Sequence, residues 1–185
     1  MEILVRLKTQ GKIRNIGLSN YTPEETEQAM RFGPIVSSQP RYNMIFTQED
    51  ETLKFCKANE IGVIPHSVLS KGLLGGKYKP GHTFAPDDER RLFNFFRGSL
   101  FETIYEVTEK LKAWAEDRDR DLIQLAVAWV VANPAVTSAI VGMKSVTQVE
   151  NVSKAATWKL TDSDLSDIKN IIGDLSPLWI KDQVN

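Results

Sequence analysis

The 185-residue chain has little cysteine or histidine, no long apolar run and no excess of charge of either sign. Its one cysteine, Cys56, cannot form an internal disulfide, and its apolar neighbours predict a small buried thiol in a reducing compartment. No apolar stretch is long enough to cross a bilayer, and charged residues follow the segment 1–4 too closely for a signal peptide. The sequence therefore predicts a cytoplasmic protein without a membrane span.

The charge balance excludes two classes of partner. With 23 basic and 24 acidic residues the formal net charge is -1, so bulk electrostatics favours neither nucleic acid nor an anionic membrane surface. Apolar residues make up 42% of the chain and charged residues 25%, which is typical of an ordinary globular protein. We expect one domain over residues 1–185.

A repeated pattern of short apolar segments and helix starts indicates the fold class. After an opening helix over residues 1–10, an apolar segment over 13–18 precedes Thr22-Pro23-Glu24-Glu25, which combines a cap, a first-turn proline and a capping-box glutamate. The segment 35–39 precedes a helix start at Thr47, and the segment 61–66 precedes a long stretch without a sustained period. Each unit predicts a strand that leads into a loop or helix.

The second part of the chain adds helices and a fourth such unit. Helical spacing is clear from Ile104 to Trp114 and again from Asp121 to Val130, where Asn133-Pro134 ends the pattern. The segment 139–142 predicts a fourth strand, followed by helices that begin near residue 146 and after Thr161. Four parallel βα units form either half of an eight-stranded barrel or part of an open doubly wound sheet.

Polar residues follow all four expected strands, at the ends where parallel βα folds place their functional groups. Amide side chains at Asn20 and Gln39 suit recognition of a carboxamide, and Lys144 with Ser145 at a helix start suits a phosphate. Each of these residues alone is more simply explained as a turn residue, a strand end or a solvated surface residue. Their occurrence together at successive strand ends predicts a nucleotide site.

At these residues the sequence resembles the aldo-keto reductases, in particular the subgroup that includes the voltage-gated potassium channel β subunits and related bacterial reductases. Segments 11–21, 39–43, 62–78 and 139–145 are similar, in order and spacing, to that family's fifth, sixth, seventh and eighth strands with their loops. The resemblance implies the C-terminal half, strands five to eight, of a (β/α)8 TIM barrel.

The resemblance also implies NADPH as cofactor and no metal site. It places the nicotinamide carboxamide on Ser19, Asn20 and Gln39, the pyrophosphate along Ser67, Leu69 and Lys71, and the adenosine 2′-phosphate on Lys144 and Ser145. Two positions depart from the family's pattern. His66 stands where the family generally has an aromatic residue stacked on the nicotinamide. The acidic-Asn pair expected to bind adenine is Glu150-Asn151, which lies one residue closer to Lys144 than the family's pattern implies.

The family's catalytic groups are not expected in this chain. The resemblance implies a proton-donating tyrosine tuned by a lysine, an aspartate and a histidine, all from the first half of the barrel. Only twelve residues precede Ile13, too few for four βα units. Tyr42 is interpreted as a packing residue, and His66, with an ordinary pKa of about 6.5, is the one side chain worth testing as a recruited proton donor.

Half a barrel would leave two strand edges and a barrel-facing apolar surface uncovered. A second copy of the chain, a separate N-terminal half or a repacked interior would each resolve this. Three functions remain open: the cofactor-binding half of a reductase, inactive alone; a non-catalytic nucleotide-binding or regulatory module; and a truncated product without activity.

Overall fold

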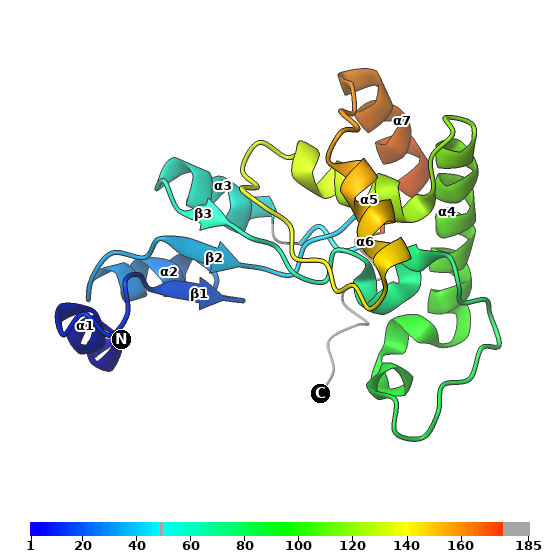
Figure 1. Ribbon diagram of the computed structural model, residues 1–185. Helices are drawn as coiled ribbons and strands as arrows, with labels where there is room; N and C mark the ends of the chain where they lie inside the picture. The colour runs from blue at the N-terminus through cyan, green and yellow to red at the C-terminus, as the bar shows by residue number, and fades with distance from the viewer. Residues whose placement is uncertain (49, 176–185) are drawn as a thin grey trace.

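The computed structural model describes residues 1–48 and 50–175 and has an α/β fold in which a small parallel sheet leads into a group of helices (Figure 1). The strands are β1 (Gly17–Ser19), β2 (Ser37–Gln39) and β3 (Gly62–Val63). The helices are α1 (Glu2–Thr9), α2 (Pro23–Met30), α3 (Asp50–Ala58), α4 (Gly98–Glu116), α5 (Leu122–Ala132), α6 (Val146–Ala155) and α7 (Asp162–Ile172). Three 3₁₀ segments, η1 (Ser70–Gly75), η2 (Glu89–Leu92) and η3 (Asn94–Phe96), lie in the long connection between β3 and α4.

The three strands pair in chain order and all run parallel, as the repeated pattern predicted. In register, Leu18 lies beside Ser38 and Ser38 beside Val63, and these three residues form the buried face of the sheet. The opposite face begins with Gly17, Ser37 and Gly62, so it is made of small and polar groups. Apolar side chains at these three positions are found only on the buried face.

The fourth strand, expected over 139–142, does not form as a regular strand. The chain here runs beside β3 with one parallel bridge between Val63 and Val136, and the Ile140 amide donates to the Pro65 carbonyl at 2.9 Å. Proline has no N–H, so Pro65 cannot donate a hydrogen bond back to this segment. Regular strand pairing beside β3 therefore does not continue past Pro65. The segment keeps the position expected for a fourth strand without its regular hydrogen bonding.

The helix starts follow the predicted caps. Thr22 accepts from the Glu25 amide while the Glu25 carboxylate accepts from the Thr22 amide, which completes the capping box at α2. Asp121 caps α5 through the Gln124 amide at 2.8 Å, and Asn133 ends that helix before Pro134. These contacts are local in sequence, which explains why they could be predicted.

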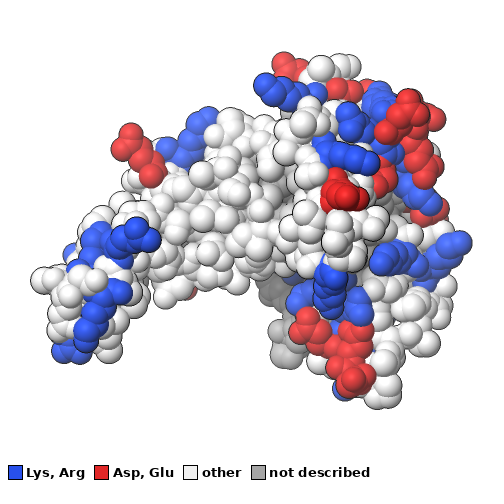
Figure 2. Space-filling model, viewed as in Figure 1, with Lys and Arg blue, Asp and Glu red and all other residues white. Residues whose placement is uncertain are grey.

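Helix α1 forms as expected but covers little apolar surface. None of its residues is buried, and the Ile3 side chain remains 64% exposed. The helix lies at the end of the molecule opposite α4 (Figure 1). Side chains of Lys and Arg gather there, whereas the end formed by α4 and α7 carries both signs of charge (Figure 2).

Helix α5 joins two apolar cores. Leu125 and Ala126 pack with α4 and α7 around Ile104, Leu111 and Ile168. From the same helix, Val127 and Val130 pack under the sheet with Ile16, Leu18, Leu53, Cys56 and Val63. Helix α5 is apolar on most of its surface because it is covered from both sides.

Cys56 is fully buried, as predicted, and burial raises the pKa of its thiol. Within the part of the chain that the structure describes, no helix is long and apolar enough to span a membrane. Nor do residues 1–48 and 50–175 contain a group of three or more His, Cys, Asp or Glu residues that could hold a metal ion.

Truncation of Leu111 should show how much the helical core contributes. This side chain is fully buried in α4, so Leu111→Ala should lower the free energy of unfolding by about 2 to 5 kcal/mol, the usual cost of such a cavity. Lys110→Ala, on the exposed face of the same turn, should change it by less than about 0.5 kcal/mol. Urea unfolding followed by circular dichroism measures both, and equal losses would contradict the assignment of this core.

Candidate functional site

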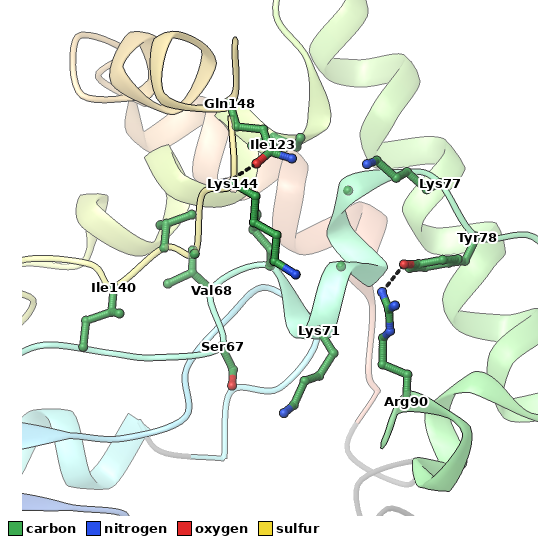
Figure 3. Close-up of a pocket in the computed structure, with 15 residues that line it drawn as sticks. Ser67, Val68, Lys71, Lys77, Tyr78, Arg90, Ile123, Ile140, Lys144 and Gln148 are labelled. Atoms are coloured by element: carbon green, nitrogen blue, oxygen red, sulfur yellow. Dashed lines mark hydrogen bonds between the residues drawn. The ribbon is translucent and has the colours of Figure 1, made fainter. Parts of the chain in front are cut away.

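The largest cavity described lies beyond the carboxyl end of β3, between η1, the start of α5 and the segment before α6 (Figure 3). Its volume is about 430 Å³. The residues that line it are Ser67, Val68, Leu69, Lys71, Gly72, Gly75, Lys77, Tyr78, Arg90, Ile123, Ile140, Val141, Gly142, Lys144 and Gln148. We call it the cationic cavity, for the charges that it carries.

Four of these lining residues are basic and none is acidic: Lys71, Lys77, Arg90 and Lys144. They come from three separate segments, so the fold and not a single charged run gathers them. Figure 3 shows the Lys144 side chain descending from the α6 side toward η1, which carries Lys71. Since like charges repel, such a group is stable only with counter-charges nearby or an anionic ligand between them.

Two of the cations have acidic partners just outside the cavity wall. The Lys71 amino group lies 2.8 Å from the Glu89 carboxylate. Arg90 donates from Nε to Asp88 at 2.8 Å and from its terminal nitrogen to the Tyr78 hydroxyl. Hydrogen bonds from the Arg90 side chain and backbone lower the pKa of the Asp88 carboxyl to about 2. These contacts fasten the loop that carries η2 against the wall of the cavity.

The backbone along this wall adopts an uncommon conformation. Three non-glycine residues, Ser67, Ser70 and Lys71, have positive φ values of 57°, 45° and 55°. Gly72 follows at 95°, where any side chain would be strained. Such φ values cost free energy and persist only where surrounding contacts hold the chain.

Asn43, fully buried in the loop after β2, supplies such contacts. Its Nδ2 donates to the Ser67 carbonyl at 3.0 Å, and its Oδ1 accepts from the amides of Ile45 and Phe46 at 3.0 and 3.1 Å. One side chain thereby ties the loop after β2 to the loop after β3. The position of Ser67, where the cavity begins, depends on this tie.

A chain of hydrogen bonds links three of the predicted residues. His66 Nε2 lies 2.9 Å from Asn20 Oδ1, and His66 Nδ1 lies 2.9 Å from the Ser67 hydroxyl. Because an amide oxygen only accepts, Nε2 is the nitrogen that carries the proton. Beside this chain, the Ser19 hydroxyl and the Asn20 amide both donate to the Gln39 carbonyl, at 3.1 and 3.3 Å. The ends of β1, β2 and β3 are thus joined through predicted residues, of which Gln39 contributes its backbone carbonyl and Asn20 both its backbone amide and its side chain.

At the start of α6, Ser145 serves as the helix cap. Its hydroxyl accepts from the Gln148 amide at 3.3 Å, while the Gln148 side chain accepts from the Lys144 amide at 2.6 Å. Lys144 lines the cavity and Ser145 does not. The two neighbours expected to share a phosphate therefore have different surroundings in this structure.

The pair Glu150-Asn151 is not among the residues that line the cationic cavity. Asn151 lines a smaller slot of about 50 Å³, which shares Leu69, Ile123, Gly142 and Gln148 with that cavity. The Asn151 Oδ1 accepts from Gln124 at 2.6 Å and its Nδ2 donates to Asp121. Glu150 is exposed and lines none of the cavities described. Asn151 thus links α5 to α6, and the role of this pair in binding adenine stays a prediction.

Some residues of the cavity were not identified from the sequence. Lys77, Arg90 and Gln148 all line it, and Arg90 lies far along the aperiodic stretch after β3. Lys77 stands in Gly75-Gly76-Lys77, a glycine-rich segment that could have drawn attention. No local signal marks Arg90, because its position depends on the fold of the long loop.

The interpretation of Tyr42 as a packing residue is confirmed. Its ring is 3% exposed and stacks on Trp129 with the ring centroids 5.1 Å apart. The hydroxyl accepts a hydrogen bond from Asn133 at 3.1 Å. Burial is the main cause that raises the pKa of Tyr42 to about 12, which makes this hydroxyl a poor proton donor.

Comparison with known proteins connects this geometry to a family. The sequence profile of the Aldo/keto reductase family matches residues 1–172. The chain is 31% identical over 173 residues to the aldo-keto reductase YhdN of Bacillus subtilis. It is 35% identical over 129 residues to a probable voltage-gated potassium channel subunit beta of Arabidopsis thaliana, a match that covers 66% of this chain and 38% of that protein.

A solved structure agrees with the sequence matches. The glycerol dehydrogenase AKR11B4 of Gluconobacter oxydans superposes with a TM-score of 0.85 at 28% identity, covering 94% of this chain and 53% of its own. The match to YhdN likewise covers 92% of this chain and 52% of that protein. The chain therefore spans about half the length of the relatives that it matches.

Removal of the Asn43 side chain should test the tie between the two loops. Asn43→Ala removes three hydrogen bonds of one buried side chain, each worth about 0.5 to 1.5 kcal/mol, while the Ser67 carbonyl keeps the Ser70 amide and the Phe46 amide keeps the Asn43 carbonyl. We expect the free energy of unfolding to fall by at least about 2 kcal/mol in urea titrations. Asn59→Ala, which removes one exposed local bond, should cost less than about 0.5 kcal/mol. An equally small loss of unfolding free energy in Asn43→Ala would show that other contacts hold the loop after β2 to the loop after β3.

Proposed function

The chain belongs to the aldo/keto reductase family, and we propose that it forms the NADPH-binding C-terminal half of that family's eight-stranded barrel. Three parallel strands in chain order, each followed by a helical segment or loop, support this assignment. The position of segment 136–140 beside β3 supports its correspondence to the eighth strand. The half-length of the match to relatives agrees with it.

The single observation that carries the proposal is the cationic cavity. Members of the family use a nicotinamide cofactor, which is a source of hydride when bound. Lys71, Lys77 and Arg90 would hold its pyrophosphate, because a cavity lined by cations and by no acidic side chain suits a phosphate anion. The acidic partners of Lys71 and Arg90, Glu89 and Asp88, are not among the lining residues. Gly142 also fits a close approach, since a Cβ there would meet no atom within 4 Å. We assign the 2′-phosphate to Lys144, with Ser145 at the helix start beside it.

The nicotinamide end would lie against Ser19, Asn20, Gln39 and His66, where the ends of the three strands meet. His66 is poorly suited to act as a proton donor, because its Nε2 proton is already given to Asn20. We assign it a positioning role, in which the ring, held on both sides by Asn20 and Ser67, would pack beside the nicotinamide. No catalytic residue is proposed among the residues that the structure describes.

The uncovered edge of the sheet would need a partner. Among residues 1–48 and 50–175, strand β1 pairs with β2 alone. The small polar face that begins at Gly17 and Ser37 would be the inner surface of a closed barrel. A separate N-terminal half or a second copy of the chain would supply the missing strands. The first is the better match for the half-length similarity to relatives, which contain both halves.

One observation favours a second function. The match to a potassium channel subunit beta raises the alternative of a non-catalytic, nucleotide-sensing module. Such a module would keep the cationic cavity and need no proton donor. Binding of NADPH is expected under both functions, whereas turnover on addition of an N-terminal half is expected only under the first.

Lys144 should discriminate between the two nicotinamide cofactors. A cation on the 2′-phosphate makes a charge-assisted contact that NADH cannot make, worth about 1.5 to 3 kcal/mol. Lys144→Ala should therefore weaken NADPH binding about tenfold or more and leave NADH nearly unchanged, as measured by calorimetric titration. Lys79→Ala, an exposed lysine outside the cavity, is the matched control. Equal losses of affinity for both cofactors would show that Lys144 does not contact the 2′-phosphate.

The chain alone should reduce carbonyl compounds at no more than the background rate. Without a positioned acid it lacks a contribution of about 10²- to 10⁴-fold, and it also lacks the opposite wall that would orient the substrate. The measurement is steady-state NADPH oxidation with a reactive aromatic aldehyde, using protein from a host without its own reductases. His66→Ala is the control: activity that disappears with this change would make His66 a recruited acid and overturn the proposal.

A further inference from the structure

Helix α6 begins at the cationic cavity, but little apolar surface holds it to the rest of the chain. Lys144 and Gln148, at its start, line the cavity. Among the residues of α6 only Ala155, in the last turn, is fully buried. Val146 and Val149, nearer the cavity, are 74% and 50% exposed. The position of this end of α6 therefore depends on polar contacts as well as on apolar burial.

Three residues form a closed ring of hydrogen bonds between α6 and the start of α5. The Asp121 carboxylate accepts from the Gln124 backbone amide at 2.8 Å with one oxygen and from the Asn151 side-chain amide with the other. The Gln124 side-chain amide donates to Asn151 Oδ1 at 2.6 Å. Helices α5 and α6 pack against each other (Figure 1). The ring therefore fastens α6 to the capped end of α5.

The carboxylate of Asp121 fixes the direction of this ring. A carboxylate has no hydrogen to donate, so Asn151 turns its Nδ2 toward Asp121 and its Oδ1 toward Gln124. Both ends of the Asn151 amide are thereby bonded within the protein. The slot that Asn151 lines has a volume of about 50 Å³, which suits a few water molecules and not a purine ring. These contacts suit a side chain that joins two helices better than one that recognises a base.

One turn of α6 connects the ring to the cationic cavity. Gln148 lies three residues before Asn151 and lines both the slot and the cavity. Its side-chain oxygen accepts from the Lys144 amide at 2.6 Å (Figure 3). Residues three apart in an α-helix lie on the same face, so a fixed Asn151 also fixes the turn that carries Gln148. The Lys144 backbone is thus held at the edge of the cavity that its side chain lines.

We propose that Asn151 is a positioning residue, which through Asp121 and Gln124 fixes the start of α6 so that Lys144 meets the 2′-phosphate of NADPH. The role given to Lys144 rests on the proposed function. Asn151 acts through protein contacts and does not touch adenine, in contrast to the role that the family resemblance implies. Selectivity for NADPH over NADH then depends on a polar ring outside the cavity as well as on the cation at the phosphate.

The first test is calorimetric titration of the whole chain with NADP⁺, NAD⁺ and deamino-NADP⁺, in which an oxygen replaces the amino group of adenine. In Asn151→Ala, NADP⁺ binding should weaken about tenfold and NAD⁺ binding should change little, because Lys144 is no longer held at the phosphate. Deamino-NADP⁺ binding should weaken by the same factor as NADP⁺ binding. Ser153→Ala, on the exposed side of α6 with one local bond, should leave all three affinities unchanged.

Two results of this titration would overturn the proposal. One is a preference for NADP⁺ over NAD⁺ that persists in Asn151→Ala. The other is a loss of affinity for NADP⁺ that deamino-NADP⁺ does not share, which would make Asn151 an adenine contact. If Asn151→Ala is unstable in thermal unfolding, Gln148→Ala keeps the ring and removes only the acceptor of the Lys144 amide. It should also lower the preference for NADP⁺, and a retained preference would overturn the proposal.

An exchange of partners tests the ring itself. Asn151→Asp places a second carboxylate beside Asp121, and like charges in contact repel, so the preference for NADP⁺ should fall. Asn151→Asp combined with Asp121→Asn restores all three bonds, with the donor and the acceptor of one bond exchanged. The double variant should recover the preference. A double variant that folds and is as unselective as the single one would contradict the ring.

Amide hydrogen exchange tests the positioning role without any cofactor. Exchange at the Lys144 and Gln148 amides should be about tenfold faster in Asn151→Ala and unchanged in Ser153→Ala. Unchanged exchange in Asn151→Ala would refute the role, whatever binds in the cavity. Faster exchange together with equal affinities of the unmodified chain for NADP⁺ and NAD⁺ would support the ring as the link that fixes α6. The same result would refute the assignment of the 2′-phosphate to Lys144.

Discussion

The amide of Asn43, enclosed between two loops, is the contact on which the candidate site depends. It holds the Ser67 carbonyl from one side and two backbone amides from the other. The backbone that follows Ser67 passes through positive φ values at Ser70 and Lys71, a path that a free loop would rarely take. Ser67 and Lys71 both line the cationic cavity, so one buried side chain positions part of its wall.

Helix α5 has a comparable role for the rest of the fold. Its two sides belong to two cores, one under the sheet and one among α4 and α7. Its first turn contributes Ile123 to the cationic cavity, and its last turn places Asn133 on the Tyr42 hydroxyl. The sheet, the helices and the site are therefore coupled through one apolar element, and a change in its packing would reach all three.

The sequence was informative where structure depends on near neighbours. The helix starts at Thr22 and Asp121 depend on hydrogen bonds to backbone amides three residues away, and the parallel order of the strands follows from repeated βα spacing. The fourth strand was predicted wrongly as regular, because the missing donor at Pro65 acts on a segment about seventy residues later. Arg90 could not be identified at all, since only the folded loop brings it to the cavity. Lys144 was identified with Ser145 from its place at a helix start, and the resemblance to a family specified the 2′-phosphate. The role of Lys71 came from the resemblance, and local pattern alone would have left it as a surface lysine.

The free edge of β1 has a thermodynamic consequence. A strand that pairs on one side only exposes backbone donors and acceptors that any added strand would satisfy. A strand that paired there would bind the folded chain and not the unfolded one, so its binding free energy would add to that of folding. The stability of the chain would then depend on the concentration of that strand. The midpoint of a melting transition would report how much of the added strand is present as well as how well the core is packed.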